Sequence, residues 1–207
     1  VMKASIDDFF QRAEEKLGKS GAKLYLIPGN DDYNEIAEYV EKAANDHVIP
    51  FDNKIIDIQG YSFLGYGYSN QTPWATPREK EEKSIYKDLK KLVEKIDAEK
   101  AVYVIHVPPY KTEIDKAPQL SKDMRQSAYD FQQVGSLSVR KIIEESPPIL
   151  GLHGHVHESG GIDYVVSKTK AKVPVINPGS EYNFGVLRGV IVELEGNNLG
   201  KYTFTKG

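Results

Sequence analysis

Apolar residues recur along the chain at two spacings, one typical of helices and one typical of buried strands. The helical spacing predicts helices over residues 4–18, 34–45, 78–97 and 136–145. Short apolar runs predict buried strands over residues 23–27, 101–107 and 149–153. Two further runs predict a hairpin over 54–59 and 61–66 that turns at Gly60, and the tail, 172–206, predicts three strands broken at Asn177–Ser180 and Gly196–Gly200.

The remaining segments are polar or rich in turn formers. Residues 67–77 are expected to be irregular, and residues 108–134 are expected to form a long polar connection. Ser5 is expected to cap the first helix, which Gly18 follows. Because Lys and Glu alternate along 78–97, that helix is expected to present a solvated face.

The order of these elements predicts the fold class. Strands alternate with helices in the first part of the chain, and the end is rich in strands, which indicates a layered α/β fold. The 207 residues suit a single domain over 1–207, and no internal repeat or linker divides them.

Composition narrows the function classes. The chain has no cysteine, which excludes disulfides, thiolate zinc sites and cysteine nucleophiles and fits a cytoplasmic protein. A formal net charge of −3 gives no basic footprint for nucleic acid, and no apolar run approaches the roughly 20 residues that span a bilayer. The glycine-rich phosphate-binding motifs of dinucleotide-binding and P-loop proteins are absent from the sequence.

Histidines mark the first candidate chemistry. His106 ends the strand 101–107, and His153, His155 and His157 follow one another at alternate positions after the strand 149–153. A single histidine at a strand end is more often structural, whereas an alternating run favours metal binding. In an extended segment His155 and His157 project to one side, roughly 6–7 Å apart, so each can bind one ion of a metal pair.

A third candidate segment also follows a predicted buried strand. Asn30, Asp31 and Asp32 come directly after Gly29 and offer hard oxygen ligands. Alone, this segment is more typical of an Asx turn that caps the helix 34–45. Beside the two histidine segments it favours a site built from several strand ends, where open α/β sheets place their ligands.

These segments form an ordered set of motifs: Gly29-Asn30-Asp31-Asp32, then His106, then Gly154-His155-Val156-His157. The set resembles the calcineurin-like metallophosphoesterase superfamily, and looks closest to its small archaeal and bacterial members. Residues 104–110, 152–163 and 176–185 extend the resemblance, which runs from about residue 23 onward.

The resemblance implies a fold, an activity and a set of metal ligands. The fold is a four-layer αββα sandwich, and the activity is metal-dependent hydrolysis of phosphomonoesters or phosphodiesters by a hydroxide that two metal ions activate. The cofactors are two divalent ions drawn from Mn, Fe, Zn or Ni. One ion is bound by Asn30, His106 and His155, and the other by His157.

The resemblance also implies catalytic and substrate-binding residues. Asp31 occupies a position where the family has a histidine that faces the leaving group, so Asp31 and His155 are the catalytic candidates. An aspartate there repels a phosphate dianion unless it is protonated or faces away. Asn70 and Thr72, in the aromatic and polar loop 67–77, are candidates to bind substrate, with a packed Ω-like loop as the alternative.

Two family motifs are absent from this sequence. The family begins with D-x-H and G-D-x-x blocks that supply the remaining metal ligands, and neither occurs here. Two explanations stand: a phosphoesterase shortened at its N-terminus and lacking its first strands, or a degenerate site. The expected partner is a phosphoester substrate, and no membrane association is expected. Assembly into a homo-oligomer is left open. The alternative function is an inactive scaffold that binds other proteins through the same fold.

Overall fold

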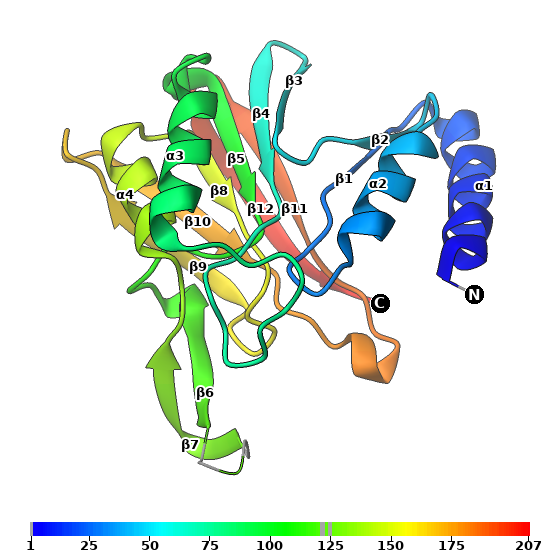
Figure 1. Cartoon of the computed structure of the whole chain (residues 1–207). Helices are drawn as coiled ribbons and strands as arrows, with labels where there is room; N and C mark the ends of the chain where they lie inside the picture. Colours follow the sequence, from blue (N-terminus) through cyan, green and yellow to red (C-terminus); the bar gives the residue numbers. More distant parts are fainter. Residues whose placement is uncertain (1, 121–122, 124–125) are drawn as a thin grey trace.

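The computed structural model describes residues 2–120, 123 and 126–207. Its centre is a six-stranded mixed sheet in the order β3-β4-β5-β8-β10-β9 (Figure 1). The strands β4, β5, β8 and β10 run parallel, and β3 and β9 pair antiparallel at the two edges. The six strands are β3 (Lys54–Ile58), β4 (Tyr61–Tyr66), β5 (Ala101–Ile105), β8 (Leu150–Leu152), β9 (Gly161–Val166) and β10 (Lys172–Asn177).

Apolar side chains cover both faces of this sheet. The helices α3 (Glu82–Val93) and α4 (Leu137–Glu145) pack on one face, where Ile85, Leu89 and Ile142 are fully buried. The hairpin of β11 (Arg188–Glu195) and β12 (Asn198–Lys206) packs on the other, against Leu150 and Ile176 (Figure 1). The sheet therefore lies between a helical layer and a two-stranded layer.

A second, smaller unit lies beside this core. Strands β1 (Leu24–Leu26) and β2 (Val48–Pro50) pair in parallel as a separate two-stranded sheet. The helices α1 (Met2–Ser20) and α2 (Asn34–Lys42) lie next to it, on the far side from α4 (Figure 1). Because the loop after β1 carries Asn30, the way this unit is held against the sheet decides where that residue lies.

Two glycines and one arginine hold the smaller unit on strand β4. A Cβ at Gly65 would lie 2.3 Å from the carbonyl oxygen of Phe51, and one at Gly67 would lie 2.0 Å from that of Pro28, so both positions require glycine. The buried Arg78 donates from Nε to the Gly29 carbonyl at 3.1 Å and forms an ion pair with Asp52.

Most predicted elements of the core are confirmed. The α/β class is confirmed, as are the hairpin turning at Gly60, the strand within 101–107 with both faces covered, and the three C-terminal strands. The segment 67–77 is irregular as expected, and Ser136 caps α4 by accepting a hydrogen bond from the backbone of Val139 at 3.2 Å.

Two predicted helices differ from those in the structure. The first helix begins at Met2, so Ser5 lies within it and is not its N-cap. Helix α3 spans Glu82–Val93 and not 78–97, because the backbone of residues 78–80 pairs with Ser69 and Asn30. Its expected solvated face covers only part of its surface, since one side packs in the core.

Other strands were not predicted from the sequence. The expected connection 108–134 contains the hairpin of β6 (Lys116–Leu120) and β7 (Gln126–Gln133), which projects from the body in Figure 1. Strands β2 and β9 were missed because one is short and the other has Gly, Asp and Tyr among its apolar residues. In the part of the chain that the structure describes, no helix has the length and apolar character to cross a membrane.

Replacing Arg78 tests whether the buried ion pair holds the smaller unit in place. Arg78→Met leaves the carboxylate of Asp52 without its partner, so the free energy of unfolding should fall by about 3 kcal/mol in urea titrations. Arg12→Met is the control: Arg12 pairs with Asp8 on the exposed face of α1, and its loss should cost less than about 1 kcal/mol. Equal losses in the two variants would contradict the role given to Arg78.

Candidate functional site

Three strand ends bring the candidate site together. Asn30 follows β1, His106 follows β5, and His155 follows β8. Backbone hydrogen bonds join the ends of β4, β5 and β8: the His106 amide donates to the Tyr66 carbonyl at 2.8 Å, and the Gly154 amide donates to the His106 carbonyl at 2.8 Å. The site thus lies at the carboxyl ends of parallel strands, as the sequence predicts.

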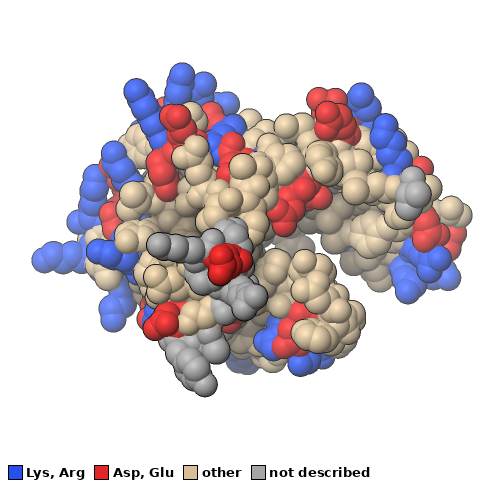
Figure 2. All heavy atoms as spheres, turned by 60° about the horizontal axis from the view of Figure 1, so that its bottom comes forward, with Lys and Arg blue, Asp and Glu red and all other residues tan. Residues whose placement is uncertain are grey.

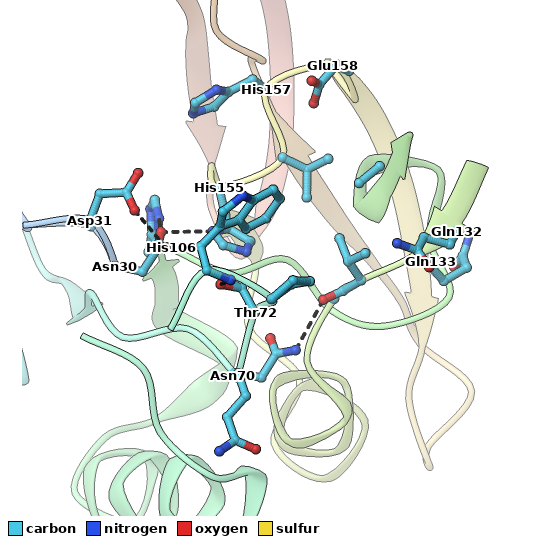
Figure 3. Close-up of a pocket in the computed structure, with 18 of the residues that line it drawn as sticks. Asn30, Asp31, Asn70, Thr72, His106, Gln132, Gln133, His155, His157 and Glu158 are labelled. Atoms are coloured by element: carbon cyan, nitrogen blue, oxygen red, sulfur yellow. Dashed lines mark hydrogen bonds between the residues drawn. The ribbon is translucent and has the colours of Figure 1, made fainter. Parts of the chain in front are cut away.

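The side chains of Asn30, His106 and His155 converge on one point, and we call them the Asn–His–His cluster. Asn30 Oδ1 lies 2.8 Å from Nε2 of His106 and 3.0 Å from Nδ1 of His155. The two imidazole centroids are 5.2 Å apart, and the rings are inclined at 72°. Figure 3 shows the three side chains turned toward one another at the edge of a pocket.

Unusual backbone geometry supports this cluster. His155 has a φ of 66°, a left-handed conformation that non-glycine residues adopt rarely and that occurs often at functional sites. A Cβ at Gly29 would lie 3.0 Å from Cε1 of His106, so glycine there lets the loop after β1 approach the ring. Both features help to fix the positions of the two imidazole rings.

A chain of hydrogen bonds sets the orientation of the Asn30 amide. Asn30 Nδ2 donates to Thr76 Oγ1 at 2.9 Å, and Thr76 Oγ1 donates to Glu79 Oε1 at 2.7 Å. The same Glu79 oxygen accepts from the Thr72 hydroxyl. Because an ionised carboxylate only accepts, it fixes the direction of every bond in the chain and turns Oδ1 of Asn30 toward the histidines.

The protonation state of Glu79 agrees with this role. Burial raises its pKa, but the hydrogen bonds from Thr72 and Thr76 outweigh burial and lower the pKa below its usual value. Thr76 and Glu79 were not predicted from the sequence, since they lie in a segment expected to be partly irregular and partly helical. Nothing in their spacing distinguishes them from ordinary turn and surface residues.

The two histidines of the cluster are neutral at physiological pH. Burial, followed by the charges of His155 and His157, lowers the pKa of His106 to about 3. Burial and then His157 lower the pKa of His155 to about 4, although Asp31 and Glu79 act in the opposite direction. Neutral imidazole is the form that binds transition metals.

The other two histidines of the alternating run lie elsewhere. His153 is buried and its Nδ1 donates to the carbonyl of Ile105 at 2.9 Å, so its contacts are structural. His157 is exposed, packs against Tyr182 with centroids 5.3 Å apart, and lies away from the cluster in Figure 3. The extended conformation predicted for the segment with His155 and His157 is wrong. The backbone of His155 is left-handed, which turns the chain before His157.

The donor set of the cluster is incomplete for a metal centre. It offers two imidazoles and one amide oxygen, without a carboxylate. Among residues 2–120, 123 and 126–207, no three or more His, Asp or Glu side chains are arranged to hold a metal ion. Metal binding by the cluster therefore depends on Asn30 as a ligand.

A pocket of about 980 Å³ opens in front of the cluster. Its lining includes Asp31, Asn70 and Thr72, the residues predicted to act on or bind substrate. Asn70 Nδ2 donates to the Val134 carbonyl at 3.2 Å, which orients its amide within the pocket wall. Figure 2 shows the hollow on this face, with Asp and Glu side chains beside it and most of the visible Lys and Arg along the outer edges.

Known proteins resemble this chain in sequence and in fold. No family model matches the sequence. It is 34% identical over 165 residues to the uncharacterized protein MJ1162 of Methanocaldococcus jannaschii, a match over 78% of this chain and 66% of that protein. The chain therefore spans just under two thirds of this relative's length.

Two solved structures share the fold. One, 19% identical, matches 99% of this chain and 68% of its own with a TM-score of 0.64. The other, TT1561 of Thermus thermophilus, is 16% identical and matches 99% of this chain and 79% of its own with a TM-score of 0.58. At these identities the similarity shows a common α/β fold alone.

Three histidines with lowered pKa values predict how stability depends on pH. The pKa values of His106, His153 and His155 are about 3, 4 and 4 in the folded chain, against roughly 6.5 in an unfolded one. At pH values between these pKa values, the unfolded chain binds more protons than the folded chain does. The contribution of these histidines to the free energy of unfolding is therefore fully present above about pH 6.5. It falls as the pH decreases toward their pKa values in the folded chain.

We expect the free energy of unfolding to decrease by at least about 2 kcal/mol between pH 7 and pH 5. Urea titrations at constant ionic strength across this range measure the change. A free energy that stays constant or increases on acidification would contradict the neutral, buried state of these rings.

Proposed function

We propose that this protein is a metal-dependent phosphoesterase of the calcineurin-like metallophosphoesterase type, with the four-layer αββα sandwich of that superfamily. The observation that carries the proposal is the convergence of Asn30, His106 and His155 from three separate strand ends. The ordered motifs of the sequence support the same family.

The spacing of the cluster fits a divalent ion. Ligands at right angles on an ion with bonds of about 2.1 Å lie about 3 Å apart. The distances from Asn30 Oδ1 to His106 Nε2 and to His155 Nδ1 are 2.8 and 3.0 Å. Two neutral nitrogens and one amide oxygen suit Mn, Fe, Zn or Ni better than Mg or Ca.

Each residue of the cluster then has a defined task. Asn30, His106 and His155 hold one ion, and Thr76 keeps the Asn30 oxygen facing it. When bound, divalent ions lower the pKa of water toward about 7 and neutralise charge on phosphoryl oxygens. His157 also lines the pocket, where it would serve a second ion; the described residues show no complete set of ligands for that ion.

The remaining pocket residues face the substrate. Asp31 is exposed in the pocket next to Asn30, and its carboxylate is the candidate for proton transfer in the reaction. Asn70 and Thr72 line the pocket from the loop 67–77 and contact the rest of the phosphoester.

Hydrolysis of bis(p-nitrophenyl) phosphate with Mn²⁺ tests the proposed function. His155→Ala removes one nitrogen of the cluster, so turnover should decrease at least about 100-fold. His47→Ala is the matched control, because His47 pairs with Glu14 on α1 and lies outside the pocket. Its turnover should match the wild type.

Two results would contradict the proposal. One is turnover by His155→Ala equal to that of the wild type. The other is an absence of turnover by the wild type with Mn²⁺, Zn²⁺, Ni²⁺ and Fe²⁺, which would favour the inactive scaffold.

A further inference from the structure

The formal charges on the pocket wall are negative. Among the described residues that line the pocket, the charged side chains are the carboxylates of Asp31, Asp32, Glu82 and Glu158. A bound anion therefore meets carboxylates on part of the pocket wall that the described residues form.

Two of these carboxylates are tied to the backbone, so their charges are fixed in place. Asp32 accepts from the Gly29 amide at 2.7 Å, in the turn after β1. Glu82 accepts from the amides of Leu137 and Ser138 at 2.9 and 2.8 Å, at the start of α4. Asp31 follows the proposed metal ligand Asn30 and lies beside it in the pocket lining, with Asn30 Nδ2 3.4 Å from Asp31 Oδ1.

We propose that the pocket selects phosphodiesters, which carry one negative charge, over phosphomonoesters, which carry two. This inference rests on the proposed function. The second ionisation of a phosphomonoester has a pKa of about 6, so at pH 8 the monoester is a dianion. Repulsion between the additional charge and nearby carboxylates acts in a partly water-excluded site, where it is stronger than in bulk water.

The other wall of the pocket suits the second ester group. Its side chains are uncharged and include Asn70, Thr72, Trp74 and Leu137. Trp74 and Leu137 are 59% and 57% exposed, which leaves apolar surface available to a ligand. The second ester group of the substrate is accordingly an uncharged alcohol with apolar or aromatic surface.

Two esters with the same leaving group differ in charge and in the second ester group, so the effect of Asp31→Asn on their ratio isolates the charge. The Mn²⁺-loaded protein is assayed at pH 8 with bis(p-nitrophenyl) phosphate and with p-nitrophenyl phosphate. We expect kcat/KM for the diester to exceed that for the monoester by at least about tenfold. Asp31→Asn should reduce this ratio by about tenfold, because it removes one charge and keeps the shape of the side chain.

Glu15→Gln is the matched control, since Glu15 is an exposed carboxylate on α1 outside the pocket. It should leave the ratio unchanged. A wild-type protein that hydrolyses the monoester as well as the diester would overturn the inference and leave the proposed function standing. A ratio that Asp31→Asn does not change would do the same.

Equilibrium binding decides the question where turnover is too slow to measure. Titration calorimetry with inorganic phosphate and with dimethyl phosphate compares a dianion with a monoanion on the Mn²⁺-loaded protein. Asp31→Asn should raise the affinity for inorganic phosphate about tenfold relative to dimethyl phosphate. An equal effect on both anions would overturn the inference, and binding of neither would overturn it together with the proposed function.

Discussion

The contact between strand β4 and the loops after β1 and β2 is the constraint on which the site depends. The two histidines of the cluster come from the main sheet, whereas Asn30 comes from the smaller unit. These parts share no strand pairing among the described residues, so the geometry of the cluster depends on how closely they pack. Gly65 and Gly67 allow the backbone of Phe51 and Pro28 to lie directly on β4.

The charged side chain of Arg78 also stabilises that contact. Its guanidinium lies 4.1 Å from the ring of Tyr68, donates to the Gly29 carbonyl and pairs with Asp52, while its backbone amide donates to the Asn30 carbonyl at 3.0 Å. A buried arginine is stable only with such partners, so these interactions form together. The same side chain thus links the fold of the smaller unit to the position of Asn30.

Electrostatics and orientation then make the cluster suitable for a cation. Burial keeps the imidazoles of His106 and His155 neutral, and the bonds from Asn30 through Thr76 to Glu79 present an oxygen, not an amide N–H, to them. Asn30 Oδ1, His106 Nε2 and His155 Nδ1 can each accept a hydrogen bond. Without a cation these three atoms repel one another unless protons lie between them. A divalent ion between these atoms would remove that repulsion, as the proposed function requires.

Much of the cluster was predictable from sequence, because buried parallel strands appear as apolar runs and their carboxyl ends share one edge. Asn30, His106 and His155 were found in this way. The geometry of His157 was not, since a single left-handed residue at His155 changes the direction of the chain and spacing rules assume an extended segment. Thr76 and Glu79 were missed because their roles depend on long-range contacts.

The hairpin β6–β7 and strand β9 were not predicted for a related reason: their residues are polar or mixed, and pairing with distant segments outweighs local propensity. The same limit applies to Arg78, which lies at the start of a charged segment and resembles a surface residue in sequence. Its burial follows from Asp52 and Tyr68, which approach it only in the folded chain.

Binding of Mn²⁺ at equilibrium tests the central claim most directly. Electron paramagnetic resonance of free Mn²⁺ gives the affinity of the wild type, of Thr76→Val and of Thr76→Ser. The wild type should bind at least one ion per chain, Thr76→Val should bind it at least about tenfold more weakly, and Thr76→Ser should retain the wild-type affinity. A wild type that binds no Mn²⁺, or equal affinities in the two variants, would contradict a metal centre built on an oriented Asn30.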